Sequence, residues 1–172
     1  MFESKLNDCP ICGNKKIIAQ FIGRNDSDFV ECPRCGAYTI SGDFRFADQK
    51  MKLREVASSI SGYVRWRNEN GIRDTALLTS ELDELLKQDD IPAIDEIDSK
   101  AEYLLRAVKK RTTRFGEVVA FNLFTDLSLA FAADVDEFKS LFKFLEDNQM
   151  LEIINRQDLS GGFPVKLTPQ GF

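Results

Sequence analysis

Short apolar runs occupy the first forty residues of the chain, and a helical spacing of apolar positions follows them. Two of these runs, 16–22 and 28–31, are separated by a segment with turn composition at 23–27, and a third covers 37–40. Short runs divided by glycine and asparagine are typical of β-strands. The pattern therefore predicts a hairpin and a third strand, with Phe21, Phe29 and Tyr38 on one thin apolar face.

Beyond Ser41-Gly42-Asp43, apolar residues recur at intervals of three and four. This spacing predicts a helix over 49–69, ended by Asn70-Gly71, and a short helix over 80–87. A longer helix opens at Pro92 and runs to about Thr113. Its acidic N-terminal end and basic C-terminal end complement the helix dipole, so neither cluster requires a ligand to explain it.

The last third of the chain has a different order of elements. Its pattern predicts a strand at 116–121, a helix at 134–148 capped by Asp134, and strands at 150–155 and 163–167. Residues 158–162 fit the tip of a wing between the last two strands. This is the order of a winged helix.

All four cysteines lie in two similar knuckles, Cys9-Pro10-Ile11-Cys12-Gly13 and Cys32-Pro33-Arg34-Cys35-Gly36. Two Cys-x2-Cys pairs at this separation are typical of a tetrahedral zinc site. Four thiolates leave no open position for an activated water, which makes the zinc structural. A rubredoxin-like iron site is the alternative, because ligand chemistry alone does not separate the two metals. Four buried cysteines without a metal are the third interpretation.

Together these patterns predict an α+β protein. A small three-stranded zinc ribbon at 1–42 precedes a mainly helical body at 43–115. A winged-helix-like unit at 116–172, packed with 80–115, ends the chain. The ribbon is too short to build a core without its metal.

Charge is arranged in blocks along the chain, whose net charge is −5. Residues 41–73 hold seven basic and four acidic side chains. Residues 74–98 hold one basic and nine acidic side chains, and residues 99–115 hold six basic and one acidic. Pairing of these blocks within the fold is the favoured interpretation. The alternative is a basic patch for nucleic acid or another anion, formed by Arg65, Arg67, Lys109, Lys110, Arg111 and Arg114.

The composition argues against catalysis. The chain has no histidine, its four cysteines are assigned to a metal, and it has no phosphate-binding glycine loop or nucleophile elbow. DNA reading by the 134–148 helix is also disfavoured. Its expected outward positions mix both signs of charge, namely Asp136, Glu137, Lys139, Lys143, Glu146 and Asp147. We therefore predict a protein that is not an enzyme.

No run of eighteen apolar residues exists, and residues 1–7 lack the basic start and apolar run of a signal peptide. The expectation is a cytoplasmic protein with no membrane partner. The sequence does not indicate an oligomeric state.

Four kinds of segment follow one another along the chain in a characteristic order. They are the two knuckles, Leu53-Arg54-Glu55, Ile60-Ser61-Gly62-Tyr63-Val64-Arg65 and the ending Leu167-Thr168-Pro169-Gln170-Gly171. This order resembles the N-terminal region of certain bacterial multidomain proteins. In those proteins a zinc ribbon and a winged-helix-like region precede a TIR-like or nucleoside-deoxyribosyltransferase-like effector domain. The resemblance spans nearly all of the chain and implies a piece of a longer parent protein, although a deliberately short protein is the alternative.

The resemblance implies a sensing, regulatory or assembly module for a nucleotide-cleaving effector, with a role in defence against phage. No catalytic residue is carried over. The leading hypothesis is thus a noncatalytic, zinc-stabilised interaction, sensor or regulatory module whose partner is a protein or a fused effector domain. The alternative is a nucleic-acid-binding transcriptional regulator.

Overall fold

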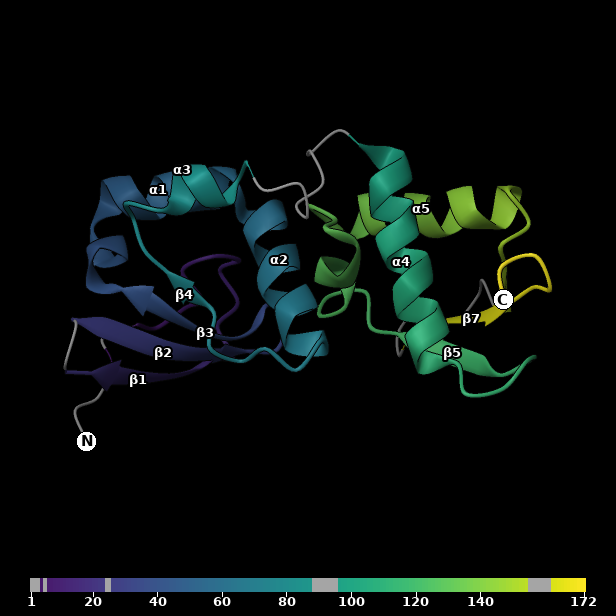
Figure 1. Ribbon diagram of the computed structural model, residues 1–172, viewed down its shortest axis with the longest axis horizontal. Coiled ribbons are helices and arrows are strands. Elements are labelled where there is room, and N and C mark those ends of the chain that lie inside the picture. The colour runs from purple at the N-terminus through teal and green to yellow at the C-terminus, as the bar shows by residue number, and fades with distance from the viewer. Residues whose placement is uncertain (1–3, 5, 24–25, 88–95, 155–161) are drawn as a thin grey trace. The chain divides into compact units, whose positions relative to one another are not determined.

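A computed structural model of the chain describes residues 4, 6–23, 26–87, 96–154 and 162–172 (Figure 1). The expected α+β class is confirmed, because both helices and two sheets are present. The chain divides into two compact units, Met1–Ala93 and Ile94–Phe172. This division differs from the boundaries after residues 42 and 115 that the sequence suggests.

The first unit is built on a four-stranded sheet with the order β1-β2-β3-β4. Its strands are β1 (Ile18–Ile22), β2 (Ser27–Cys32), β3 (Gly36–Ser41) and β4 (Ala76–Leu77). The first three pair antiparallel, so the hairpin and third strand are confirmed. Strand β4 pairs parallel with β3 and was not predicted, because two residues are too few to form a recognisable run.

Helices cover one face of this sheet (Figure 1). They are the 3-10 helix η1 (Gly42–Arg45), α1 (Ala47–Glu55), α2 (Ala57–Glu69) and the short α3 (Leu82–Leu85). The helix expected over 49–69 is therefore two helices, separated at Val56, whose φ of −111° and ψ of 21° are not helical. The expected helix end at Glu69, followed by Asn70-Gly71, is confirmed, and Gly71 has a φ of +82°.

The helix-facing side of the sheet carries the core of the first unit. Tyr38 pairs with Val30 across β2 and β3, and both side chains are fully buried with Ile40, Leu53 and Ile60. Phe29 pairs with Thr39, one position further along, and therefore lies on the opposite face. The expectation that Phe29 shares a face with Tyr38 was wrong, because the two-residue period of the strand separates them.

The second unit combines helices with a sheet in the order β5-β7-β6. Its elements are α4 (Ile97–Arg111), β5 (Val118–Phe121), the 3-10 helix η2 (Leu127–Ala130), α5 (Val135–Asp147), β6 (Leu151–Ile153) and β7 (Phe163–Leu167). The Asp134 side chain accepts hydrogen bonds from the backbone N–H groups of Asp136 and Glu137, which confirms the predicted cap. The expected helix start at Pro92, and most of the expected wing tip at 158–162, lie outside the described residues.

Helix α4 belongs to this unit because its apolar stripe completes the unit's core. Ala101, Leu104 and Val108 pack in one cluster with Phe138 and Phe142 of α5. Figure 1 shows α4 crossing α5 above the sheet. The apolar spacing of α4 thus assigns this helix to the C-terminal third, which moves the boundary from residue 115 to residue 93.

Among the described residues, no helix combines the length and apolar character that a membrane crossing requires.

Candidate metal centre

The two cysteine knuckles meet in the first unit. The sulfur atoms of Cys9, Cys12, Cys32 and Cys35 all lie within 4.8 Å of one another. The distance between Sγ atoms is 3.8 Å for Cys9 and Cys35 and 3.6 Å for Cys12 and Cys32. Four sulfurs around a tetrahedral zinc at about 2.3 Å are separated by about 3.8 Å. The cluster therefore has the dimensions of a four-thiolate metal site.

Local backbone geometry explains why each knuckle ends in glycine. Gly13 has a φ of +73° and its N–H donates to the carbonyl of Cys9, which closes the first knuckle. Gly36 has a φ of +92°, and a Cβ added there would come within 2.9 Å of the Asn68 side chain. Positive φ and close packing thus both favour glycine at 36. In the second knuckle the N–H of Cys35 also donates to the sulfur of Cys32.

Two hydroxyl groups from outside the knuckles contact the sulfur cluster. The Tyr38 hydroxyl lies 3.0 Å from Cys9 Sγ, and the Ser61 hydroxyl lies 3.2 Å from Cys35 Sγ. Burial raises the pKa of the Tyr38 phenol well above its usual range, so the phenol keeps its proton. A metal-bound thiolate has no proton, and each hydroxyl therefore donates to it. These bonds orient the ligands and satisfy buried charge.

The cluster requires a cation to hold four thiolates. The hydrogen bond from Cys12 lowers the pKa of the Cys9 thiol, whereas burial raises the pKa of Cys35 well above its usual range. Four negative sulfurs in a buried site repel one another unless a metal ion neutralises them. Three of the four cysteines are buried, and Cys12 is partly exposed. The donor set and its burial thus fit a bound metal ion.

An ion-pair network anchors helix α1 to the first knuckle. Asp8, the residue before Cys9, accepts from Lys50 Nζ and Arg54 Nη2, each at 2.8 Å. The hydrogen bond from Lys50 lowers the pKa of Asp8. Both cations lie on α1, while the Ser61 contact comes from α2. The break at Val56 therefore separates α1, which pairs with Asp8 beside the first knuckle, from α2, which contacts Cys35.

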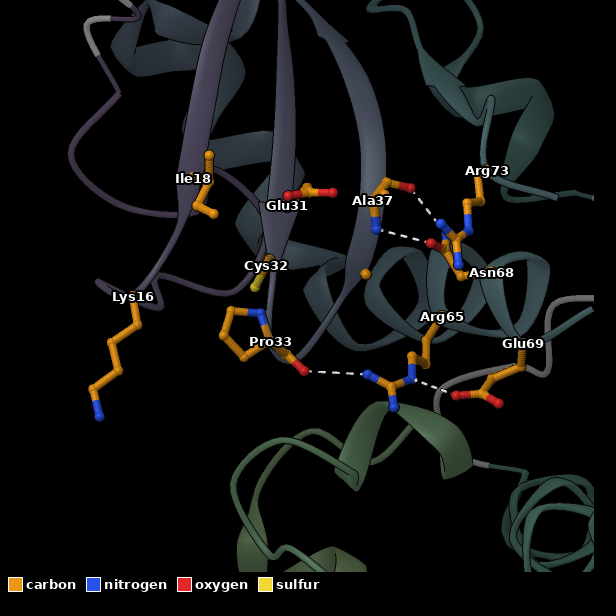
Figure 2. Close-up of a pocket in the computed structure, with 11 residues that line it drawn as sticks. Lys16, Ile18, Glu31, Cys32, Pro33, Ala37, Arg65, Asn68, Glu69 and Arg73 are labelled. Carbon is orange, nitrogen blue, oxygen red and sulfur yellow. Dashed lines mark hydrogen bonds and ion pairs between the residues drawn. The ribbon is translucent and has the colours of Figure 1, made fainter. Parts of the chain in front are cut away.

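A groove of about 590 Å³ opens beside the second knuckle (Figure 2). Figure 2 shows Arg65 between the carbonyl of Pro33 and the carboxylate of Glu69, with bonds of 3.1 Å to each. Asn68 bonds to both the N–H and the carbonyl of Ala37, which ties α2 to β3. The lining mixes three cations with two carboxylates, namely Lys16, Arg65, Arg73, Glu31 and Glu69. Such mixed charge does not by itself define an anion site.

The six cations that the sequence suggests for nucleic acid belong to two different units. Arg65 and Arg67 lie on α2, in the first unit, and the other four lie at or after the end of α4, in the second. Arg67 donates to Thr75 and Tyr63. Arg111 forms a two-pronged ion pair with Asp126, at 2.8 and 2.9 Å, over the ring of Phe121. These three arginines have structural partners.

Lys109, Lys110 and Arg114 are exposed in the second unit. They are the members of the predicted patch whose side chains face solvent at the end of α4.

Sequence reasoning did not assign Ser61, Asp8, Lys50 or Arg54 to the metal centre. Ser61 lies 26 positions beyond Cys35, and Lys50 lies 42 positions beyond Asp8. Contacts at such separations depend on the packing of helices against the sheet. The buried stretch 58–64 of α2 contains Ser58, Ser59 and Ser61, and serines on the packed face of a helix are the signal that could have indicated polar partners.

Comparison of the chain with models of protein families, with curated proteins and with solved structures found no match.

Proposed function

We propose that the protein is a noncatalytic, zinc-stabilised module that binds another protein. In this proposal the first unit is a zinc ribbon extended by α1 and α2, and its metal is structural. The compact sulfur cluster supports zinc, because four thiolates in a tetrahedral arrangement are its usual structural ligand set. Tyr38 and Ser61 contact two of the sulfurs, so the surroundings of the cluster stabilise bound thiolates rather than an activated water.

The second unit is, in this proposal, a winged helix that serves in docking. The order α4, β5, η2, α5, β6, β7 and the sheet order β5-β7-β6 support this assignment. In that fold α5 takes the position of the DNA-recognition helix. The chemistry of the outward surface of α5 then determines whether the unit binds nucleic acid or protein.

The observation that carries the proposal is that Lys143 is paired within α5, while aromatic side chains elsewhere in the second unit are exposed. Lys143 forms ion pairs with Glu146 and Asp147 at 3.1 and 2.6 Å, so the charge of its ammonium is neutralised within α5. Phe124 is 73% exposed, and Phe115 and Phe172 form an exposed edge-to-face pair. Exposed aromatic side chains are enriched at protein interfaces, whereas phosphate binding requires free cations.

Fluorescence anisotropy of labelled single- and double-stranded DNA and RNA tests this proposal. We expect the zinc-loaded protein to show no binding that weakens steeply between low and moderate salt. Tight, salt-sensitive binding would contradict the proposal and favour the nucleic-acid alternative. In that case the exposed residues Lys109 and Arg114 are the first to replace by alanine, and lost affinity would locate the contact.

A site-specific crosslink tests the protein partner directly. A photo-crosslinking amino acid at Phe124 should give a discrete adduct with one protein in cells that express the chain. The matched position is Glu102, which is exposed on α4 and paired with Arg106. Equal labelling from both positions would indicate non-specific capture and contradict the proposal.

A further inference from the structure

Strand β1 forms an open edge of the first sheet. Among the described residues, β2 is the only strand that pairs with it, and the backbone groups of Ile18–Ile22 make no hydrogen bond outside that ladder. The side chains of Ile18 and Ile22 are 59% and 40% exposed. An edge strand with unpaired N–H and C=O groups is a template for another strand.

The edge also lacks the devices that normally prevent such pairing. The sequence Ile-Ala-Gln-Phe-Ile contains no proline and no charged residue. Its register with β2 runs one residue to one residue from Ile18 to Ile22, without a bulge. Natural sheets usually protect an exposed edge with a lysine, a proline or a bulge. This strand therefore remains competent for pairing.

The exposed side chains of β1 are arranged symmetrically about its centre. Gln20 is the middle residue, isoleucine lies two positions away on each side, and Ala19 and Phe21 flank it. If two copies of the strand pair antiparallel about Gln20, each Ile18 lies opposite an Ile22. Each Ala19 then lies opposite a Phe21, so that a small side chain faces a large one. We propose that β1 pairs with β1 of a second copy of this chain, which joins the two four-stranded sheets into one.

The self-complementary pattern is what selects a second copy rather than an unrelated peptide. Both isoleucine pairs lie on the sheet face that the helices leave open, where Ile18 and Ile22 are exposed in the single chain. Apolar cross-strand pairs each contribute about 0.2–1 kcal/mol. An interface of one short strand is small, so we expect a weak dimer that dissociates in the micromolar range. This inference is independent of the proposed protein-docking surface on the second unit.

Sedimentation velocity of the full zinc-loaded chain over a concentration series tests the dimer. The wild-type protein should change from monomer to dimer as its concentration rises, and Ile22→Lys should remain monomeric while it retains its metal. Met51→Lys is the matched control. Met51 is 61% exposed on α1, away from the edge, so this variant should dimerise like the wild type.

A crosslink tests the register. Gln20→Cys should form a disulfide-linked dimer under mild oxidation in the presence of zinc, because the two residues at position 20 face each other. The variant Ile18→Cys should not form such a dimer, because in this register residue 18 lies opposite Ile22 of the second copy. A wild-type chain that stays monomeric to about 1 mM, a range where even weak association is visible, would overturn the proposal. Undiminished dimerisation of Ile22→Lys, or equal crosslinking at both positions, would overturn it as well.

Discussion

The hydroxyl of Ser61 lies 3.2 Å from the sulfur of Cys35, and this contact joins helix α2 to the cysteine cluster. Both residues are fully buried. A coordinated thiolate in such a position needs a hydrogen-bond donor, because burial removes water from it. The contact therefore connects α2 to the cysteine cluster, and the Ser61 hydroxyl is placed to donate to a metal-bound thiolate of Cys35.

Removal of this hydroxyl should weaken metal binding. In Ser61→Ala the thiolate of Cys35 loses its donor, and loss of a partner in the layer around a metal typically lowers affinity by about 10–100-fold. We expect about a tenfold loss, measured by competition with a zinc chelator.

Ser59→Ala is the matched control for that experiment. Ser59 is a buried serine on the same helix, and its hydroxyl makes no contact with a cysteine among the described residues. Its replacement should leave metal affinity unchanged. Equal losses in both variants would mean that helix packing, rather than the Cys35 contact, controls the site.

Asp8 should stabilise the first unit through its two cations on α1. Asp8→Asn removes the charge that binds Lys50 and Arg54, and we expect a loss of about 1 kcal/mol at neutral pH, as is typical for partly exposed ion pairs. Chemical denaturation followed by Trp66 fluorescence measures this loss, since Trp66 is the single tryptophan and lies on α2. Asp48→Asn, at an exposed position near the start of α1, is the control.

The pH dependence of this difference has a defined sign. The hydrogen bond from Lys50 lowers the pKa of Asp8 below its ordinary value of 3.8. The stabilisation is therefore fully present above 3.8 and is lost only as the pH falls through the lower folded-state pKa. Between about pH 5.5 and 8 the difference between wild type and Asp8→Asn should be constant. A difference that changes steeply within this range would contradict the assignment.

Arg111 should stabilise the second unit rather than bind nucleic acid. Arg111→Lys cannot reproduce the two parallel bonds to Asp126 or the stacking over Phe121, and we expect a loss of about 1–3 kcal/mol in thermal or chemical unfolding. Lys109→Ala, at an exposed position two residues earlier, should change stability by less than about 0.5 kcal/mol. Similar effects of the two substitutions would argue against the structural role of Arg111.

Local patterns in the sequence were sufficient to predict the cysteine cluster and the elements around it. The spacing of Cys9, Cys12, Cys32 and Cys35 identified the four residues that the structure brings together. The hairpin was predictable because a turn sequence separates two short apolar runs. Asp134 was recognisable as a helix cap because its side chain acts within one turn of its own backbone.

Features that depend on distant contacts were not predictable in the same way. Strand β4 is defined by its pairing with β3 and has no pattern of its own. The break at Val56 falls in a sequence whose apolar spacing continues from Leu53 to Ile60, so periodicity alone favoured one helix. The roles of Arg67 and Arg111 also depend on tertiary partners, whereas their sequence context indicated only local positive charge.

The metal content of the purified chain, measured together with Trp66 fluorescence, tests the central claim most directly. We predict one zinc per wild-type chain and none in Cys35→Ser, whose Trp66 emission should shift to the red as α2 loses its attachment to the metal centre. Purified wild-type chain without zinc would contradict the account. A Cys35→Ser protein that keeps a full equivalent of zinc and an unchanged thermal stability would contradict it equally.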